Sequence, residues 1–167
     1  MGLNSARSVL FSGAGRLNEG QAARAAAWLQ SAPATAIKIV VTHHPFDVPE
    51  GHRDDHLAGR SAMAMSRLAK VGADLFLAGH LHVSPVGHTA ERYQIAGHCA
   101  LVVQAGTLST RHRGEPNLFN LLRAWRVRRS RLSVTPGTRR ARRSCRPGAG
   151  HFSTQRTDGV WGADARI

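Results

Sequence analysis

The stretch Asp74-Leu75-Phe76-Leu77-Ala78-Gly79-His80-Leu81-His82 joins a short apolar run to two histidines. The apolar run predicts a buried strand, and the imidazoles follow at its C-terminal end. Gly79 precedes the pair and allows a tight backbone turn. Because His80 and His82 are one residue apart, both can turn toward one point. Neutral imidazole is a common ligand of divalent metals, so this stretch indicates part of a metal site.

An earlier stretch, Ile39-Val40-Val41-Thr42-His43-His44-Pro45, repeats this design. Its β-branched residues predict a second buried strand, which proline ends after the histidines. Open α/β sheets place their sites at the carboxyl ends of strands, where both histidine motifs fall. We therefore predict that His43, His80 and His82 bind metal, and that His44 orients a ligand or faces the substrate.

Two helical patterns separate these motifs. Asn18 and Gln21 form a capping box that predicts a helix start, and Pro33 ends the helix. Its apolar stripe consists of Ala22, Ala25, Ala26 and Leu29. A second helix is predicted over 58–71, with Gly72 at its C-terminal end. Its predicted apolar face consists of Ala58, Ala62, Met65 and Ala69. The order helix, strand, helix, strand predicts an α/β fold.

The chain beyond His82 has a different pattern. Short strands are predicted at 93–96, 100–105 and 118–123, and their succession without helices indicates antiparallel pairing. We expect one domain over 1–125. Residues 126–167 are predicted to be an Arg-rich tail, partly disordered, with a terminal strand within 151–161.

The basic charge is concentrated near the C-terminus. The net charge is +13 in 167 residues, and the chain has 21 Arg against 2 Lys. Twelve of these arginines lie between Arg111 and Arg146. They indicate either a solvated tail or a surface that binds nucleic acid or an acidic partner. No aromatic stacking platform lies among them, which favours the solvated tail.

The sequence predicts a soluble, cytoplasmic protein. Its two cysteines make no disulfide framework, and the first residues lack the pattern of a signal peptide. No apolar run approaches the roughly 20 residues that span a bilayer.

Nine of the ten histidines lie between His43 and His112, a density that solubility does not explain. We predict that those outside the two motifs are not ligands, although any could donate a proton. These are His52, His56, His88, His98 and His112. Cys99 is predicted to be a core residue.

Together, Val41-Thr42-His43-His44-Pro45-Phe46 and Leu77-Ala78-Gly79-His80-Leu81-His82 resemble the C-terminal half of the calcineurin-like metallophosphoesterase family. The resemblance covers roughly residues 1–123. It implies a partial α/β/β/α sandwich, with mixed sheets flanked by helices and a dinuclear metal centre at the sheet edge. It also implies hydrolysis of phosphate mono- or diesters, with nucleotides, cyclic ones included, as plausible substrates.

The resemblance assigns roles to individual residues. His43 and His80 would bind one ion, and His82 would bind the other. The ions would be Mn, Fe, Zn or Co, and two of them about 3.5–4 Å apart can clamp a phosphate for in-line attack. His44 or His52 would contact the substrate and assist at the leaving oxygen.

The chain also departs from this family. The Asp-x-His, Gly-Asp-x-x-Asp and Gly-Asn-His-Asp elements of the family's first half are absent, and no aspartate precedes Asp47. We therefore expect a fragment with an exposed edge strand, weak binding of a single metal and little activity. Two other hypotheses remain open: a non-catalytic remnant, and a basic module that binds nucleic acid or an acidic partner.

Overall fold

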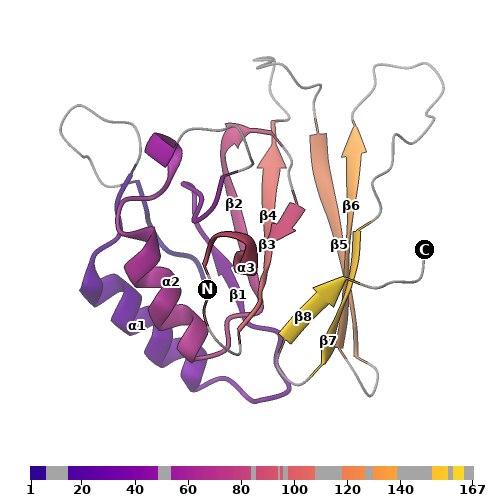
Figure 1. Cartoon of the computed structure of the whole chain (residues 1–167), viewed down its shortest axis with the longest axis horizontal. Coiled ribbons are helices and arrows are strands. Elements are labelled where there is room, and N and C mark those ends of the chain that lie inside the picture. Colours follow the sequence, from indigo (N-terminus) through magenta and orange to yellow (C-terminus); the bar gives the residue numbers. More distant parts are fainter. Residues whose placement is uncertain are drawn as a thin grey trace.

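The computed structural model describes residues 1–6, 15–48, 54–83, 86–93, 95, 98–107, 118–126, 130–138, 152–157 and 160–163. The protein has three layers, stacked side by side (Figure 1). Helices α1 and α2 form one outer layer, a mixed sheet lies beside them, and an antiparallel sheet lies beyond it. The predicted α/β class is confirmed at this level.

The mixed sheet has the strand order β1-β2-β4-β3. Its strands are β1 (Ile39–Val41), β2 (Leu75–His82), β3 (Val86–His88) and β4 (Leu101–Gly106). The first strand pairs in parallel with β2, and β2 with β4, whereas β3 is antiparallel to β4. In the pairing of β1 with β2, Ile39 lies opposite Leu75 and Val41 opposite Leu77. The two histidine motifs therefore lie at the same edge of the sheet, as the sequence predicts, although β2 continues through His80 to His82.

Helix α1 (Glu19–Gln30) begins as predicted. The Asn18 side chain accepts a hydrogen bond from the Gln21 amide at 2.8 Å, and the Gln21 side chain accepts one from the Asn18 amide at 3.0 Å. This reciprocal pair satisfies two amides that have no partner within the helix. Ala22, Ala25 and Leu29 are buried.

Helix α2 (Ser61–Lys70) begins three residues later than predicted, after Arg60 in the left-handed region at φ 65°. Its buried residues are Ser61, Ala64, Met65, Leu68 and Ala69, and Ala62 is exposed, which corrects the predicted apolar face. The predicted C-terminal glycine is confirmed. Gly72 has φ +71°, and the Ala73 amide donates to the Leu68 carbonyl at 3.1 Å.

Alternate residues of the central strands enter two different cores. Phe76 and Val102 pack with residues of α1 and α2, including Leu29 and Leu68. Leu75 and Leu101, one position away, pack on the opposite face with Leu122 of the second sheet. Since successive strand residues point to opposite faces, each central strand is apolar at nearly every position.

The second sheet has the order β5-β6-β7-β8 and is antiparallel throughout. Its strands are β5 (Leu118–Arg126), β6 (Ser130–Thr138), β7 (Phe152–Thr157) and β8 (Val160–Ala163). Strand β6 lies in the segment that the sequence predicts to be an Arg-rich, partly disordered tail, whereas β7 and β8 overlap the terminal strand predicted within 151–161. A two-residue alternation at Leu132 and Val134, among polar residues, is the strand signal there.

Two other expectations differ from the structure. The strand predicted at 93–96 is not present at the described residues Tyr93 and Ile95, because helix α3 (Thr89–Arg92) precedes them and the Tyr93 amide bonds to the Thr89 carbonyl. The edge of β1 is partly covered, since Val41 donates to the Met1 carbonyl and accepts from the Leu3 amide. Among the described residues, no helix has the length and apolar character needed to cross a bilayer.

Candidate metal centre

The two histidine turns are bonded to each other just beyond the end of β1, alongside the second half of β2. The Gly79 amide donates to the His43 carbonyl at 3.1 Å, and the Thr42 amide donates to the Leu77 carbonyl at 2.9 Å. Within the first turn, the Thr42 hydroxyl donates to the His44 carbonyl at 2.8 Å. These bonds extend the parallel pairing and hold the two turns side by side.

Three imidazoles meet at this edge: those of His43, His44 and His80. The ring centroids are 4.7 Å apart for His43 and His44, 4.6 Å for His44 and His80, and 5.3 Å for His43 and His80. One nitrogen from each ring lies within 4.8 Å of the others. This histidine trio is the candidate metal centre.

The spacing of the trio is compatible with one shared ion. Metal–nitrogen bonds of about 2.0–2.1 Å in a tetrahedral site separate two ligand nitrogens by about 3.4 Å. The trio nitrogens lie within 4.8 Å of one another, a bound that includes this separation. His43 is exposed, so its ring can rotate toward the other two. Three neutral nitrogens are a donor set suited to a borderline divalent cation.

His44 is the fixed member of the trio. Its side chain is buried at 5% exposure, and its Nδ1 lies 3.0 Å from the Ser5 hydroxyl oxygen. That hydroxyl also accepts the His44 backbone amide at 3.0 Å. Gly15, at φ +60°, lies behind the ring, and a Cβ there would be 2.2 Å from Nδ1. Only glycine therefore fits beside this imidazole.

His80 and His82 adopt left-handed backbone conformations, at φ 72° and 61°. The pairing of β2 with β4 shifts register between Ala78 and His82, which marks a bulge. Gly79, which the sequence indicates as the flexible residue, does not have a positive φ. The unusual conformation thus falls on the histidines themselves, a form of strain that is concentrated at functional sites.

Burial is the largest cause that lowers the pKa of His80 from 6.5 to about 4, and repulsion from His44, His43, His56 and His82 lowers it further. His80 is therefore neutral at pH 7 and keeps a lone pair. The His56 ring lies 5.8 Å from the His80 ring, so this residue, predicted to be a non-ligand, belongs to the surroundings of the trio.

His82 is outside the trio. Its Nδ1 is buried and has no hydrogen-bond partner among the described residues. A buried polar atom without a partner requires an explanation, and a bound cation is one.

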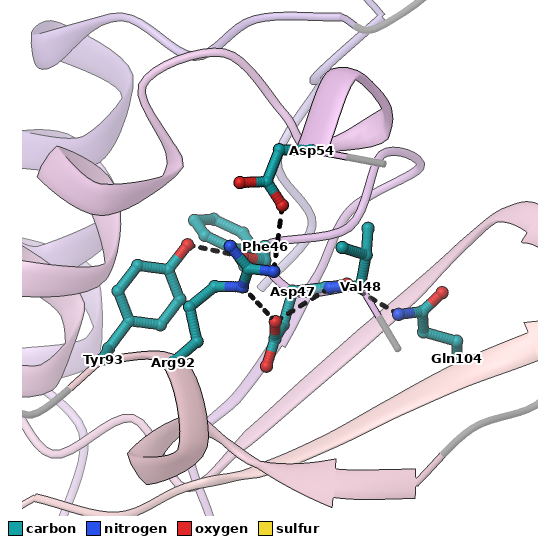
Figure 2. A network of polar contacts seen from close by, with 7 residues as sticks. All are labelled: Phe46, Asp47, Val48, Asp54, Arg92, Tyr93 and Gln104. Carbon is teal, nitrogen blue, oxygen red and sulfur yellow. Dashed lines mark hydrogen bonds and ion pairs between the residues drawn. The ribbon is translucent and has the colours of Figure 1, made fainter. Parts of the chain in front are cut away.

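Two aspartates that follow the His44 turn in the sequence, Asp47 and Asp54, are bound to Arg92 (Figure 2). The Arg92 guanidinium bonds to Asp47, and its Nη2 lies 3.0 Å from Asp54 Oδ1. The Asp47 carbonyl accepts a hydrogen bond from the Gln104 side chain at 2.7 Å. This Arg92 network fixes the chain that follows the His44 turn and neutralises both carboxylates.

The sequence therefore identifies His43, His44 and His80, which the structure brings together. His52 lies outside the described residues. Ser5 and Gly15 were not identified, because Ser5 is 39 positions from His44 and no local pattern links them. The only hint is the glycine-rich character of 13–15.

A comparison of the chain with protein-family models found no match, and neither did a search of curated proteins.

Proposed function

We propose that this chain is a metal-dependent hydrolase of phosphate esters whose cation centre is built on His43 and His80. The observation that carries the proposal is the meeting of two histidine turns from neighbouring parallel strands, with the rings of His43 and His80 5.3 Å apart. The resemblance of these two turns to the calcineurin-like metallophosphoesterases supplies the reaction class. The substrate is a phosphate mono- or diester, such as a nucleotide or cyclic nucleotide.

The residues of the chain contribute lone pairs and position. His80 is neutral at pH 7 because its pKa is lowered to about 4, so a cation does not have to displace a proton there. The orphaned Nδ1 of His82 offers a further donor, consistent with its assignment to a second ion. When bound, a divalent cation of this type supplies Lewis acidity toward a phosphoryl oxygen and lowers the pKa of water.

The charge balance limits how much metal the chain holds. The described donors at the trio are neutral imidazoles, and Asp47 and Asp54 are paired with Arg92. Two divalent cations a few ångströms apart repel strongly unless anionic ligands lie between them. We therefore expect weak binding of one ion per chain and slow turnover.

The test combines metal titration with hydrolysis of bis(p-nitrophenyl) phosphate by the purified full chain. We expect turnover that depends on added Mn²⁺ or Zn²⁺ and is abolished by His80→Ala and by His43→Ala. His98→Ala is the matched control. His98 precedes β4, at the opposite end of the strands from the trio, so its removal should leave turnover unchanged.

Turnover that is independent of added metal, or that persists in His80→Ala, would refute the proposal. An inactive chain that binds no cation would favour the non-catalytic hypothesis. Salt-sensitive binding to a polyanion, lost when 126–146 are deleted, would favour the basic binding module.

A further inference from the structure

His44 has the central position among the three imidazoles. Its ring centroid lies 4.7 Å from that of His43 and 4.6 Å from that of His80, whereas those two are 5.3 Å apart. A cation shared by His43 and His80 therefore also lies close to His44. His82 is not part of the group in which all nitrogens lie within 4.8 Å of one another.

The environment of His44 limits what the residue can do. It is 5% exposed, so its ring has little access to a substrate that arrives from solvent. Its Nδ1 is engaged with Ser5, which is itself 1% exposed. Its other ring nitrogen, Nε2, belongs to a ring that lies between those of His43 and His80.

The Ser5 hydroxyl can select the tautomer of this ring. A serine oxygen has two lone pairs, and with one of them it accepts a hydrogen bond from the His44 backbone amide. With the second it can accept Nδ1–H, which leaves the lone pair on Nε2. A histidine that binds metal through one nitrogen usually donates its other N–H to a fixed acceptor, and Ser5 is such an acceptor.

The backbone behind Ser5 is held firmly. The Ser5 carbonyl accepts the Arg16 amide at 2.8 Å, and the Gly15 carbonyl accepts the Gly59 amide at 3.0 Å. A Cβ on Gly15 would lie 2.3 Å from the Ser5 carbonyl and 2.5 Å from His44 Cε1. The ring is thus confined on one edge by Ser5 and on one side by Gly15.

We infer that His44 is the third ligand of the cation held by His43 and His80, and that Ser5 is its positioning residue. The inference rests on the proposed metal site and adds a specific ligand to it. It changes the expected role of His44 from contact with the substrate to contact with the metal.

The first experiment observes the ring nitrogens directly. The full chain, labelled with ¹⁵N at histidine, is titrated with Zn²⁺ alone, and the ring nitrogens are followed by long-range ¹H–¹⁵N correlation. We expect His43, His44 and His80 to shift with one equivalent of zinc and His98 to stay unchanged. In the zinc-free chain, His44 should already show a protonated Nδ1 and an unprotonated Nε2.

The outcomes separate the two claims. A zinc-dependent shift at His43 and His80 without one at His44 overturns this inference and leaves the proposed function intact. A chain in which no histidine shifts overturns both.

The second experiment measures zinc affinity by competition with a chromogenic chelator. Loss of an orienting partner typically weakens metal affinity by roughly 10–100-fold, so we expect Ser5→Ala to lose about tenfold and His44→Ala to lose as much as His80→Ala. His44→Gln provides a second variant that keeps more of the side-chain volume if the alanine variant does not fold.

Thr42→Val is the matched control for Ser5→Ala. Both substitutions remove a buried hydroxyl bonded to His44, but Thr42 bonds the backbone carbonyl, whereas Ser5 bonds the ring and the backbone amide. We expect Thr42→Val to leave both the ring tautomer and the zinc affinity unchanged. Equal losses of affinity in the two variants, with an unaltered His44 tautomer in Ser5→Ala, would reduce Ser5 to a structural role and overturn its assignment.

Discussion

The two histidine turns are held in place by different means. The His43-His44 turn is fixed by its surroundings: Ser5 and Thr42 bond to His44, and Gly15 lies against its ring. The Gly79-His82 turn depends on its own backbone, with left-handed conformations at His80 and His82 and a bulge against β4. The first turn should therefore fail when a neighbour changes, and the second when its own residues change.

The largest expected effect is on the first turn. Gly15→Ala should destabilise the protein by about 3 kcal/mol, because the new Cβ would lie 2.2 Å from His44 Nδ1 in a backbone conformation unfavourable for alanine. Urea unfolding followed by circular dichroism measures the change. Gly2→Ala is the control, since no atom lies within 4 Å of its added Cβ and we expect less than about 0.5 kcal/mol there.

Acid should act on the second turn. The pKa of His80 is about 4 in the folded chain, below its ordinary value of 6.5, so the unfolded chain binds the proton more tightly. Stability from this group is therefore present above pH 6.5 and is lost as the pH falls toward 4. The ring is only half-buried and partly screened by solvent, so we expect the Tm to fall by roughly 2–4 °C over this range from His80 alone.

His80→Asn isolates this contribution. Asparagine adopts the left-handed conformation readily and does not titrate between pH 4 and 6.5. The difference in Tm between the two proteins should therefore change with pH in that window. Parallel Tm profiles would show that His80 has no lowered pKa.

A smaller effect distinguishes backbone strain from side-chain contacts. At His82, the glycine variant should be more stable than the alanine variant by about 1 kcal/mol, because φ is 61° and alanine is strained there. His43 lacks a positive φ, so its glycine variant should be no more stable than its alanine variant. Thermal unfolding of the four variants tests both statements, and the same order at both positions would contradict the comparison of the turns.

The last two effects, of which the second is the smallest, concern the chain that leaves the first turn. Arg92→Gln should destabilise the protein by about 1 kcal/mol, because it releases the Asp47 carboxylate, whose side chain is only 15% exposed. Asp54→Asn should cost at most about 0.5 kcal/mol, since its side chain is 71% exposed. Urea unfolding measures the loss of stability in each variant. Equal losses in the two variants would show that the contribution of an ion pair does not depend on how deeply its carboxylate is buried.

Local signals allowed much of the fold to be predicted. The capping box of α1 and the glycine that ends α2 involve residues within a few positions of each other, and both are confirmed. The apolar runs at β1, β2 and β4 predict buried strands because each residue faces one of two cores. Strand β6 was not predicted, since arginines on either side mask the alternation at Leu132 and Val134.

The site was predictable only in part, because only some of its features have a local signal in the sequence. His43 and His44 follow β1, and His80 follows the apolar run at the start of β2, so all three could be found from the sequence. The fixed position of His44 depends on Ser5, which is distant in the chain, and the strain falls on His80 and His82 rather than on Gly79. Neither feature has a local pattern, because both result from how separate segments meet.

The alternation of β2 between two cores has a consequence for sequence change in this strand. Phe76 faces the helices and Leu75 faces the second sheet, so inserting or deleting one residue would exchange every side chain between the two environments. The same slip would carry His80 away from His43. Variation that preserves length can be absorbed by repacking, whereas a change in length must be taken up by a bulge, like that between Ala78 and His82, or it displaces the histidine centre.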